Sequence, residues 1–454
     1  MLDINAKTIL ILGAGKSGIS AAKFLLTQPV KKIILSDTRT RAKFDQEAIE
    51  LEKSGVVLET DAHKDASFIE ADIIIVSPGV PIQAKWREVA ARNNKLLIGD
   101  VEFASQFTNA KIIAITGTNG KTTVTTLIYE IFKAQLGDRV ELAGNIGIPF
   151  CDMLREGKKP EYIILEISSF QLDAIKDFKP LVSIILNVTD DHQDRYANMQ
   201  EYAMAKANIF RNQTEGDFLL LNTEDKFTNI MGSMATPKKL YFSAYRELEN
   251  GYYFKDGSFI KSLNGKKEEL FKAVDMKLLG KHNFENVLSC IITADVTGLD
   301  MAKAIETIKN FSGLHHRIEF VAEVKGVKYY DDSKGTNVDA VLKAVDTFTD
   351  DMVLILGGRE KSTDFSPLFE TLPKNVKLIV ALGENREKIK SIFSPKVEVL
   401  TSESMEDTVD KCFKAQGVKV VLLSPGCASF DLFKSYAHRG DEFKKYVLKA
   451  ASKV

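Results

Sequence analysis

The sequence predicts an α/β protein of three domains, each built on a largely parallel sheet. Three times along its 454 residues, short β-branched runs alternate with glycine turns and helix-length segments. The leading runs are "TILIL" (8–12), "KIIAIT" (111–116) and "MVLIL" (352–356). Near-continuous apolar strands separated by helices are typical of parallel sheets covered on both faces. A chain of this length also exceeds what one hydrophobic core usually spans.

Two changes of pattern mark the expected domain boundaries, near residue 100 at "LLIGD" and near residue 313 in "NFSGLHHR". We expect a Rossmann-like domain over residues 1–100 and a central domain with an ATPase-like phosphate loop and a parallel sheet over 101–313. A second Rossmann-like domain is expected over 314–454. Ligands of such sheets bind at the carboxyl ends of the strands, so the residues that end these runs are the first candidates for function.

The composition excludes several classes of protein. A net charge of -1, with 44% hydrophobic and 27% charged residues, gives no bulk electrostatic reason to bind nucleic acid or an anionic membrane. No apolar run approaches the ~20 residues that a membrane helix needs. The four cysteines are far apart and lack metal-binding spacing, which favours free thiols in a reducing compartment. We therefore expect a cytoplasmic protein without membrane insertion, with a monomer as the default state.

The first domain carries a glycine fingerprint. "GAGKSG" (13–18) follows the strand "TILIL", and Asp37 ends the next strand about 20 residues later. Taken alone, this pattern suggests a nicotinamide-dependent oxidoreductase with Asp37 on the ribose. The whole chain argues against that interpretation, because a phosphate loop follows and nothing later resembles a hydride-transfer site. Tight packing of strand against helix explains Gly13, Gly15 and Gly18 equally well, and both explanations can hold together.

The second domain opens with a shortened phosphate-binding loop, "TGTNGKTTV" (116–124). Gly117 and Gly120 allow the backbone to approach phosphate closely, and Lys121 adds a positive charge. The hydroxyl of Thr122 stands where a Mg²⁺ ligand belongs. The alternative to a phosphate-binding loop is a glycine-rich turn between strand and helix with a solvated lysine. The predicted ATP loop comprises Gly117, Thr118, Asn119, Gly120, Lys121, Thr122 and Thr123.

Two later strands of the central domain end in acidic or hydrogen-bonding side chains. Glu166 ends "YIILE", and "SIILNVTDDHQDRY" ends in a polar cluster. One such carboxylate would most simply be a cap. Two strand ends downstream of a phosphate loop instead indicate a metal and phosphate site. The cluster contains Asn187, Asp190, Asp191, His192, Asp194 and Arg195.

Between about residues 215 and 275 the pattern differs, because aromatic residues alternate around two turn-forming pairs. These pairs are Asn250-Gly251 and Asp256-Gly257. Both favour tight two-residue turns, so we expect β-hairpins that elaborate the central domain. The third domain continues with the buried runs "VKLIVALG" (376–383) and "VKVVLLSPG" (418–426), which again predict parallel strands.

The loop and later stretches together resemble the Mur ligase family, whose phosphate loop has the same short G-x-x-G-K-[ST] form. The resemblance covers nearly the whole chain, and three stretches are most similar to the D-glutamate-adding members: Ser-Ser-Phe-Gln, Asp-Asp-Ser-Lys-Gly-Thr-Asn and Ser-Pro-Gly-Cys-Ala-Ser. The Asp-Asn-Pro-Arg motif of the diaminopimelate- and lysine-adding members is absent. The matching stretches are "GNIG" (144–147), "LEISSFQL" (165–172), "DHQDRY" (191–196), "GKHNFEN" (280–286), "LHHRIEF" (314–320), "YYDDSKGTN" (329–337), "GGREKSTDF" (357–365) and "LLSPGCASFDLFKSYAHRGDEF" (422–443).

The resemblance implies an ATP-dependent ligase that adds D-glutamate to UDP-N-acetylmuramoyl-L-alanine in peptidoglycan synthesis. In this family ATP phosphorylates the acceptor carboxylate, the amine attacks the acyl phosphate, and phosphate leaves. ATP and Mg²⁺ are the implied cofactors, and Lys206 is expected to be carbamylated. The implied catalytic residues are Lys121, Glu166, His192, Lys206 and Lys334, and the implied metal ligands are Thr122, Glu166, His192 and the Lys206 carbamate.

The resemblance also assigns binding residues to each substrate. Beyond the loop, ATP is expected to contact Asn283, Asn286, Arg317 and Asp332. The UDP-linked acceptor is expected to contact Ser17, Asp37, Thr38, Arg39, Ser77, Gly79 and Asn145. D-Glutamate is expected to contact Thr336, Lys361, Ser429 and Tyr436. The family often has Phe in place of Tyr436, and Ala in place of Gly335 and Gly426.

Two alternatives to this ligase stay open at the level of sequence. A folylpolyglutamate-synthase-like ligase shares the ATP loop and the third domain, but it would not need the first domain. A nucleotide-driven switch without ligase chemistry would bind ATP but would leave "SPGCAS" and Lys206 without a role.

Overall fold

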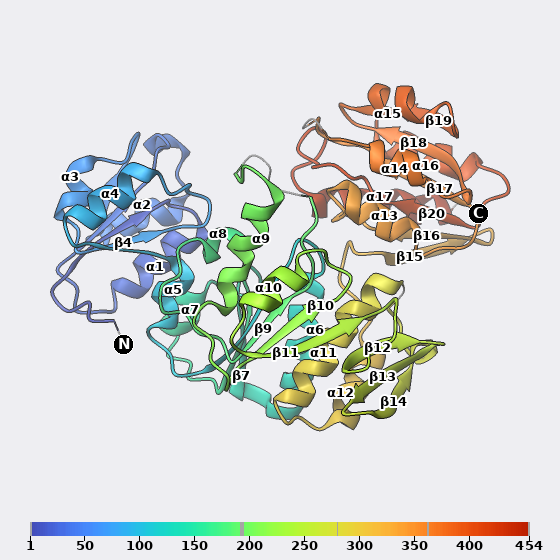
Figure 1. The fold of residues 1–454 in the computed structure, drawn as a ribbon. Coiled ribbons are helices and arrows are strands. Elements are labelled where there is room, and N and C mark those ends of the chain that lie inside the picture. The colour runs from blue at the N-terminus through green and yellow to red at the C-terminus, as the bar shows by residue number, and fades with distance from the viewer. Residues whose placement is uncertain (1, 191–194, 279, 361–362, 453–454) are drawn as a thin grey trace. The chain divides into compact units, whose positions relative to one another are not determined.

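The computed structural model describes residues 2–190, 195–278, 280–360 and 363–452. It contains three β-sheets with helices packed around them (Figure 1). By contacts the chain divides into two compact units, residues 1–273 with 285–308, and residues 274–284 with 309–454. The first unit contains two of the sheets and the second unit contains the third. Each sheet lies inside one of the three expected domains, whose boundaries stay a prediction.

The first sheet has five parallel strands in the order β3-β2-β1-β4-β5, the strand order of a Rossmann-like fold. Its central strand β1 is buried on both faces, with Ile9 and Ile11 in one apolar cluster and Leu10 and Leu12 in another. The strands are β1 (Thr8–Leu12), β2 (Lys32–Ser36), β3 (Val57–Glu59), β4 (Ile73–Val76) and β5 (Leu96–Gly99). The helices are α1 (Lys16–Leu25), η1 (Arg41–Lys43), α2 (Gln46–Lys53), α3 (Asp65–Glu70), α4 (Ala84–Arg92) and α5 (Asp100–Ser105).

The second sheet has nine strands in the order β14-β13-β12-β11-β10-β9-β6-β8-β7. All neighbours from β7 to β12 are parallel. The strands are β6 (Lys111–Thr116), β7 (Val140–Gly144), β8 (Tyr162–Glu166), β9 (Val182–Ile185), β10 (Phe218–Asn222), β11 (Lys238–Ser243), β12 (Gly251–Lys255), β13 (Ser258–Leu263) and β14 (Lys266–Lys272). The helices are α6 (Lys121–Leu136), η2 (Gly137–Arg139), α7 (Phe150–Arg155), α8 (Ser169–Leu172), α9 (Met199–Ala207), η3 (Asn208–Phe210), α10 (Thr228–Met234), η4 (Ala273–Asp275), α11 (Lys281–Val296) and α12 (Met301–Asn310).

The hairpin prediction for this sheet is right at one turn and wrong at the other. Asp256 and Gly257 both have positive φ and join the antiparallel strands β12 and β13, as expected. Asn250-Gly251 is not a hairpin turn, because β11 and β12 pair in parallel. The second hairpin turn is Asn264-Gly265, which joins β13 to β14.

The third sheet has six strands in the order β15-β16-β20-β17-β18-β19, and only its edge strand β15 is antiparallel. Strand β17 is buried on both faces, with Leu354 in one cluster and Val353 and Ile355 in the other. The strands are β15 (Glu319–Val324), β16 (Val327–Asp331), β17 (Met352–Leu356), β18 (Val376–Leu382), β19 (Glu398–Ser402) and β20 (Val420–Leu423). The helices are α13 (Val338–Val345), α14 (Ser366–Thr371), α15 (Arg386–Phe393), α16 (Met405–Lys414) and α17 (Tyr436–Ala451).

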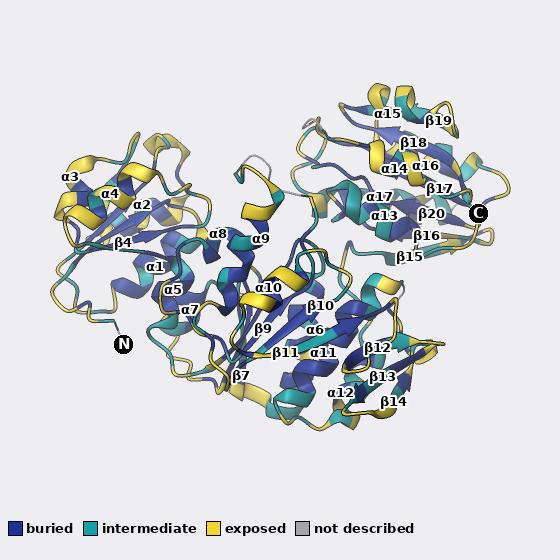
Figure 2. Ribbon diagram, viewed as in Figure 1, coloured by how far each residue is buried: buried dark blue, intermediate teal, exposed yellow. Residues whose placement is uncertain are grey.

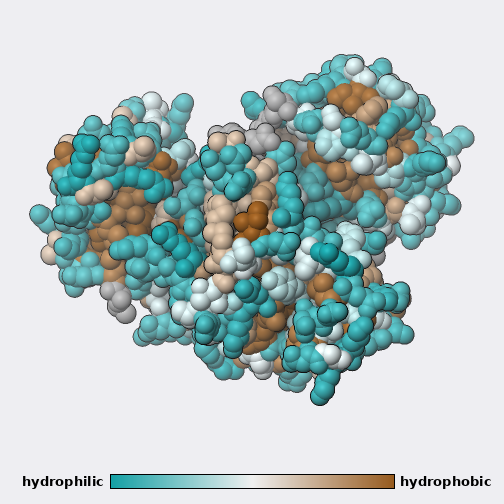
Figure 3. Space-filling model, viewed as in Figure 1, coloured by the Kyte–Doolittle hydropathy of each residue, from teal (hydrophilic) through white to brown (hydrophobic). Residues whose placement is uncertain are grey.

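The central strands of each sheet are buried, and many exposed residues lie on helices and loops (Figure 2). Hydrophilic residues cover most of the face drawn in Figure 3. Within the described part of the chain, no helix is long and apolar enough to cross a membrane. The four cysteines are buried free thiols.

The glycine fingerprint of the first domain generates a stability prediction. A Cβ on Gly18 would lie 1.9 Å from the carbonyl oxygen of Gly13, whereas a Cβ on Gly15 would meet nothing within 4 Å. Gly18→Ala should therefore lower the free energy of unfolding by more than about 2 kcal/mol, because overpacking against backbone leaves little room to relax. Urea unfolding of both variants tests this, with Gly15→Ala as the control. Equal stabilities for the two variants would contradict the packing argument.

Candidate functional site

The phosphate loop connects β6 to α6 through residues 117–120. Gly117 has φ 152° and Gly120 has φ 87°, a conformation that L side chains rarely adopt. A Cβ on Gly120 would also lie 2.5 Å from Oδ1 of Asn286. The loop therefore requires glycine at Gly120, and its backbone leads directly into the N-terminus of α6, where N–H groups favour anions.

Lys121 supplies a positive charge at this loop. Its Nζ donates hydrogen bonds to the carbonyl oxygens of Gly117 (2.8 Å) and Thr118 (2.9 Å). The ammonium group thus lies over the loop backbone from the first turn of α6. Of the two hydroxyl residues that follow, Thr122 is partly exposed and Thr123 is buried. The predicted loop residues are therefore adjacent in space as well as in sequence.

Asn187, the second residue after β9, holds the loop in place. Asn187 Oδ1 accepts hydrogen bonds from the backbone N–H of Thr118 (3.1 Å) and Asn119 (2.8 Å), while its Nδ2 donates to the carbonyl of Asn119 (3.1 Å). One amide side chain therefore satisfies three backbone groups of the loop. This gives Asn187 a positioning role, which the sequence pattern located only as a member of a polar cluster.

Glu166 lies beside the loop because β8 is a neighbour of β6, with Glu166 in register with Ile115. Its side chain is almost fully buried. Oε1 accepts a hydrogen bond from Nδ2 of Asn145 (2.9 Å), whereas Oε2 has no hydrogen-bond partner among the described residues. A buried carboxylate oxygen without a partner is costly, and an oxygen-seeking divalent cation would offset that cost. The chemistry of Glu166 thus fits Mg²⁺.

Lys206 is the least expected of these residues, since a lysine on a helix is usually solvated. Here its side chain is only 1% exposed on α9. Nζ donates to the carbonyl of Gly117 (3.1 Å) and lies 4.3 Å from the centre of the Tyr202 ring. Tyr202 in turn accepts a hydrogen bond from the hydroxyl of Thr118 (3.3 Å). Lys206 and Tyr202 therefore both contact the phosphate loop.

Some predicted residues are not covered by the structure. His192, Asp191 and Asp194 of the polar cluster, and Lys361 of the expected D-glutamate site, lie outside the described residues. Arg195 is described: Nη1 donates to the carbonyl of Pro78 (2.9 Å), and its guanidinium lies 3.9 Å from the centre of the Phe170 ring.

In the first domain, Asp37 and Arg39 form an ion pair that also bonds to the glycine turn; we call this pair the Asp37–Arg39 clasp. Asp37 Oδ2 accepts a hydrogen bond from the N–H of Ala14 (2.8 Å), and Arg39 Nη2 donates to the carbonyl of Ala14 (2.9 Å). The two side chains also pair with each other at 3.0 Å. Burial opposes ionisation of Asp37, but hydrogen bonds from Arg39 and Ala14 outweigh it and lower its pKa. The clasp is thus an anion and a cation fixed at the carboxyl end of β2.

The other residues expected to bind the acceptor differ in exposure. Ser77 is buried and donates to the carbonyl of Gly13 (3.1 Å), while Thr38, Gly79 and Asn145 are exposed. Ser17 lines a small cavity together with Asp100 and Gln171. Burial raises the pKa of Asp100 against the opposing hydrogen bonds of Gln171 and Ser17.

The second unit places a buried carboxyl at the carboxyl end of β16. Asp332 Oδ2 accepts a hydrogen bond from the hydroxyl of Ser424 (2.7 Å). Burial raises the pKa of Asp332 to about 7, against the opposing hydrogen bond of Ser424 and charge of Arg317. Lys334 follows in the same turn, and its Nζ lies 5.4 Å from the centre of the Tyr436 ring. One residue expected to bind the nucleotide, Asp332, and one expected to act in catalysis, Lys334, thus lie in the same turn.

The remaining predicted residues of the second unit have contrasting surroundings. Ser429 is buried, whereas Thr336 and Tyr436 are exposed. A Cβ on Gly335 would lie 2.5 Å from Oδ2 of Asp332, which explains why glycine stands there. Helix α11 begins in the second unit, where Asn283 is partly exposed, and continues in the first unit, where Asn286 is buried.

Comparison with known proteins matches a segment around each of the three sheets to a domain of one family. The Mur ligase middle domain profile matches residues 115–294, the MurD-like N-terminal domain profile matches 7–99, and the Mur ligase glutamate ligase domain profile matches 316–427. A Geotalea daltonii protein named UDP-N-acetylmuramoylalanine–D-glutamate ligase is 37% identical over 98% of both chains. A Koribacter versatilis protein of the same name is 38% identical over 99% of both chains. The chain belongs to the Mur ligase family.

Solved structures show the same fold at low sequence identity. The MurF ligase of Thermotoga maritima, determined in complex with ADP, aligns with a TM-score of 0.61 at 16% identity. The alignment covers 99% of this chain and 100% of the MurF chain. A pseudomurein peptide ligase type C from Methanothermus fervidus also aligns with a TM-score of 0.61, at 17% identity, and covers 98% of this chain and 99% of its own.

Sequence reasoning missed one residue of this Mur ligase that connects two loops of the second unit. Arg439 on α17 is 1% exposed, and its guanidinium donates to the hydroxyl and carbonyl oxygens of Ser333 (2.9 and 2.7 Å). It also donates to the carbonyl of Cys427 (3.0 Å). Burial lowers the pKa of Arg439 to about 10. Arg439 therefore joins the turn containing Asp332 to the loop containing Ser429.

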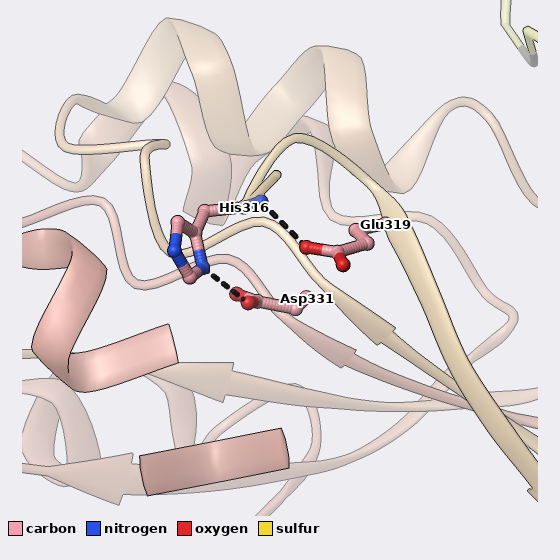
Figure 4. A group of neighbouring side chains, drawn as sticks. All are labelled: His316, Glu319 and Asp331. Carbon is pink, nitrogen blue, oxygen red and sulfur yellow. Dashed lines mark hydrogen bonds and ion pairs between the residues drawn. The ribbon is translucent and has the colours of Figure 1, made fainter. Parts of the chain in front are cut away.

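A cluster of metal-ligating residue types in the same unit is an ion-pair network. His316 Nδ1 lies 2.7 Å from Oδ2 of Asp331, and its backbone N–H donates to Glu319 at 2.8 Å (Figure 4). The ammonium group of Lys444 lies 3.0 Å from Glu319 and 4.0 Å from Asp331. A lysine in that position already compensates the carboxylates, so this cluster does not need a metal.

Arg439 yields a prediction for the Mur ligase. Arg439→Lys should lower the free energy of unfolding by at least about 2 kcal/mol, because a lysine cannot reproduce the fork that donates to Ser333 and Cys427. The Michaelis constant for the amino-acid substrate should rise as well. Arg386→Lys is the matched control, since Arg386 is a partly exposed arginine that donates to one carbonyl. Unchanged stability in Arg439→Lys would contradict the assigned role.

The raised pKa of Asp332 predicts a pH-dependent stability. In the folded state the pKa of Asp332 is about 7. In the unfolded chain the pKa of an aspartate is ~4. Between these values the folded state binds more protons, so stability falls as pH rises, by up to about 1.4 kcal/mol per pH unit. Urea unfolding of wild type and Asp332→Asn from pH 4.5 to 7.5 tests this. The free energy of unfolding of Asp332→Asn should depend less steeply on pH than that of wild type. Identical pH dependence in the two proteins would exclude a protonated Asp332.

Proposed function

We propose that this Mur ligase adds D-glutamate to UDP-N-acetylmuramoyl-L-alanine and converts ATP to ADP and phosphate in the same reaction, in peptidoglycan synthesis. The observation that carries the proposal is the match over nearly the whole chain, at 37% and 38% identity, to proteins named UDP-N-acetylmuramoylalanine–D-glutamate ligase. The phosphate loop, with Glu166 on the neighbouring strand, supports the ATP-dependent part. The folate-ligase alternative leaves the Rossmann-like first domain unexplained.

The proposed reaction has three steps. An oxygen of the acceptor carboxylate attacks the γ-phosphorus of ATP, and the bond to ADP breaks. The amine nitrogen of D-glutamate then attacks the acyl carbon and loses a proton. The tetrahedral intermediate finally expels phosphate, which takes the electron pair of the C–O bond. Such phosphoryl transfer depends on positioning and charge neutralisation more than on covalent help from the protein.

The residues of the phosphate loop support the first step. The N-terminus of α6 and the ammonium group of Lys121 provide positive field where the phosphates of ATP would bind. Asn187 keeps the loop backbone fixed, so little reorganisation is needed when phosphate arrives. Mg²⁺, held by Thr122, Glu166 and His192, would neutralise charge on the transferred phosphoryl group.

We further propose that Lys206 is carbamylated and then contributes to holding a second Mg²⁺. Burying an ammonium group this deeply is costly, and its reaction with CO2 replaces the cation with an anion that can ligate a metal. The proposal rests on the burial of Lys206 and on its contact with Gly117. The amine nitrogen bonds to the carbon of CO2, and two of the three protons of the ammonium group pass to solvent.

The substrate-binding roles expected from the family are retained as part of the proposal. The uridine diphosphate end of the acceptor is assigned to Ser17, Asp37, Thr38, Arg39, Ser77, Gly79 and Asn145. D-Glutamate is assigned to Thr336, Lys361, Ser429 and Tyr436, and the nucleotide also to Asn283, Asn286, Arg317 and Asp332. Lys334 keeps its expected catalytic role. The cytoplasmic location and the monomeric state remain predictions.

Phosphate release with single substrates omitted tests the function. Release from Mg-ATP should require both UDP-N-acetylmuramoyl-L-alanine and D-glutamate, and the product should be heavier by one glutamyl unit. L-Glutamate, glycine and L-lysine are the controls for the amino acid. Release with another amino acid alone would identify a different member of the family. Release that does not depend on the UDP-linked acceptor would overturn the proposal.

Glu166 gives the sharpest single-residue prediction. Glu166→Gln should reduce acceptor-dependent phosphate release by about 100-fold or more, the usual effect of removing one group that stabilises the transition state. Added Mg²⁺ and ADP should also stabilise the variant less against heat. Glu161→Gln is the matched control, because Glu161 is exposed just before β8 and only makes surface ion pairs. Phosphate release by Glu166→Gln at the wild-type rate would show that Glu166 is not part of the ATP site.

The carbamate has a direct spectroscopic test. Wild-type protein equilibrated with ¹³C-bicarbonate should show a carbamate carbon signal by ¹³C NMR. That signal should be absent from Lys206→Ala treated in the same way. Lys303→Ala, which removes an exposed lysine of α12, should keep the signal. A wild-type spectrum without a Lys206-dependent signal would exclude carbamylation under those conditions.

A further inference from the structure

The loop between β3 and α3, residues 60–64, supports the Asp37–Arg39 clasp from the side of the neighbouring strand. The N–H of Asp37 donates to the carbonyl of Glu59, the last residue of β3 (2.9 Å). The N–H of Asp61 donates to the carbonyl of Arg39 (3.1 Å), and Asp61 adopts a left-handed φ of 71° to do so. Asp37 is therefore bonded to the end of β3, and Arg39 is bonded to the loop itself.

His63 in this loop reaches the residue directly before the clasp. Its Nδ1 lies 2.9 Å from the hydroxyl oxygen of Ser36, which is fully buried at the end of β2. The imidazole is half-buried and packs edge-on against Trp86, with 5.3 Å between the ring centres. Burial lowers the pKa of His63, while the charges of Asp37 and Glu59 oppose that shift and Lys85 adds to it.

Ser36 is consequently held on two sides. Its carbonyl accepts a hydrogen bond from the N–H of Gly13 in the glycine turn (2.8 Å), and its hydroxyl bonds to His63. Without His63 that buried hydroxyl would lose its side-chain partner, at a cost that favours a shift of the strand end. A shift of Ser36 would move both the glycine turn and Asp37, which carry the groups expected to meet the acceptor.

We propose that His63 is a positioning residue for the uridine diphosphate end of the acceptor. It fixes Ser36, and through Ser36 it aligns the glycine turn with the Asp37–Arg39 clasp. The inference rests on the proposed function, since it concerns the first-domain site for that substrate. His63 does not contact the reacting atoms, so its loss weakens binding of the acceptor and leaves the chemical step unchanged.

Steady-state kinetics of matched variants test the role. His63→Phe keeps an aromatic ring against Trp86 but loses the hydrogen bond, and Ser36→Ala removes the same bond from its other side. Each should raise the KM for UDP-N-acetylmuramoyl-L-alanine about tenfold, the effect of one buried hydrogen bond. The kcat and the KM values for ATP and D-glutamate should stay within twofold of wild type.

Three further variants separate positioning from general stability. His63→Asn, whose amide group can hydrogen-bond to the Ser36 hydroxyl in place of Nδ1, should recover most of the acceptor affinity. The double variant Ser36→Ala/His63→Phe should match either single variant, because both remove one interaction. Thr60→Ala, which removes a loop hydroxyl bonded to Asp61, is the control and should behave as wild type. An unchanged acceptor KM in His63→Phe, or equal rises in all three KM values, would overturn the inference.

Calorimetric titration with UDP distinguishes failure of the inference from failure of the proposed function. If wild type and His63→Phe bind UDP equally, the inference is wrong and the ligase assignment stands. If His63→Phe binds UDP more weakly but wild type shows no acceptor-dependent turnover, the ligase assignment fails and the positioning role stands. If wild type does not bind UDP at concentrations that saturate turnover with the acceptor, the inference is overturned.

Discussion

The arrangement of β9, β6 and β8 as neighbouring parallel strands is the constraint on which the candidate ATP site depends. Ile115 is in register with Glu166 on one side, and Thr116 is in register with Ile185 on the other. Parallel strands that pair in this register end at one edge of the sheet. The phosphate loop, Glu166 and Asn187 therefore meet there, although about 70 residues of chain separate the first from the last.

Buried charge is the second common feature of the functional regions. Lys206 and Glu166 beside the phosphate loop, and Asp332 and Arg439 in the second unit, are all buried. Burying such groups costs stability unless hydrogen bonds compensate. Lys206 and Arg439 donate to backbone carbonyls, whereas one oxygen of Glu166 has no hydrogen-bond partner in the described part of the chain. Unsatisfied polar groups of this kind concentrate where ligands bind.

The sequence predicted the fold and the strand ends well, because apolar runs and glycine turns are local signals. It located Glu166 and the loop for the same reason. It could not predict that Asn250-Gly251 would join parallel strands, since strand pairing depends on tertiary context. Nor could local pattern show that Arg439 or Lys206 is buried, because a lone charged residue on a helix usually faces solvent. Lys206 was identified only through the family resemblance.

The central claim is that the edge formed by β6, β8 and β9 binds the metal–nucleotide substrate. Anomalous diffraction from crystals grown with Mn²⁺ and a non-hydrolysable ATP analogue tests it most directly. A manganese peak within coordination distance of Glu166, with the analogue's phosphates on the loop at Gly117 and Lys121, is the predicted result. A peak at His316, Glu319 and Asp331 instead, with none beside Glu166, would contradict the account.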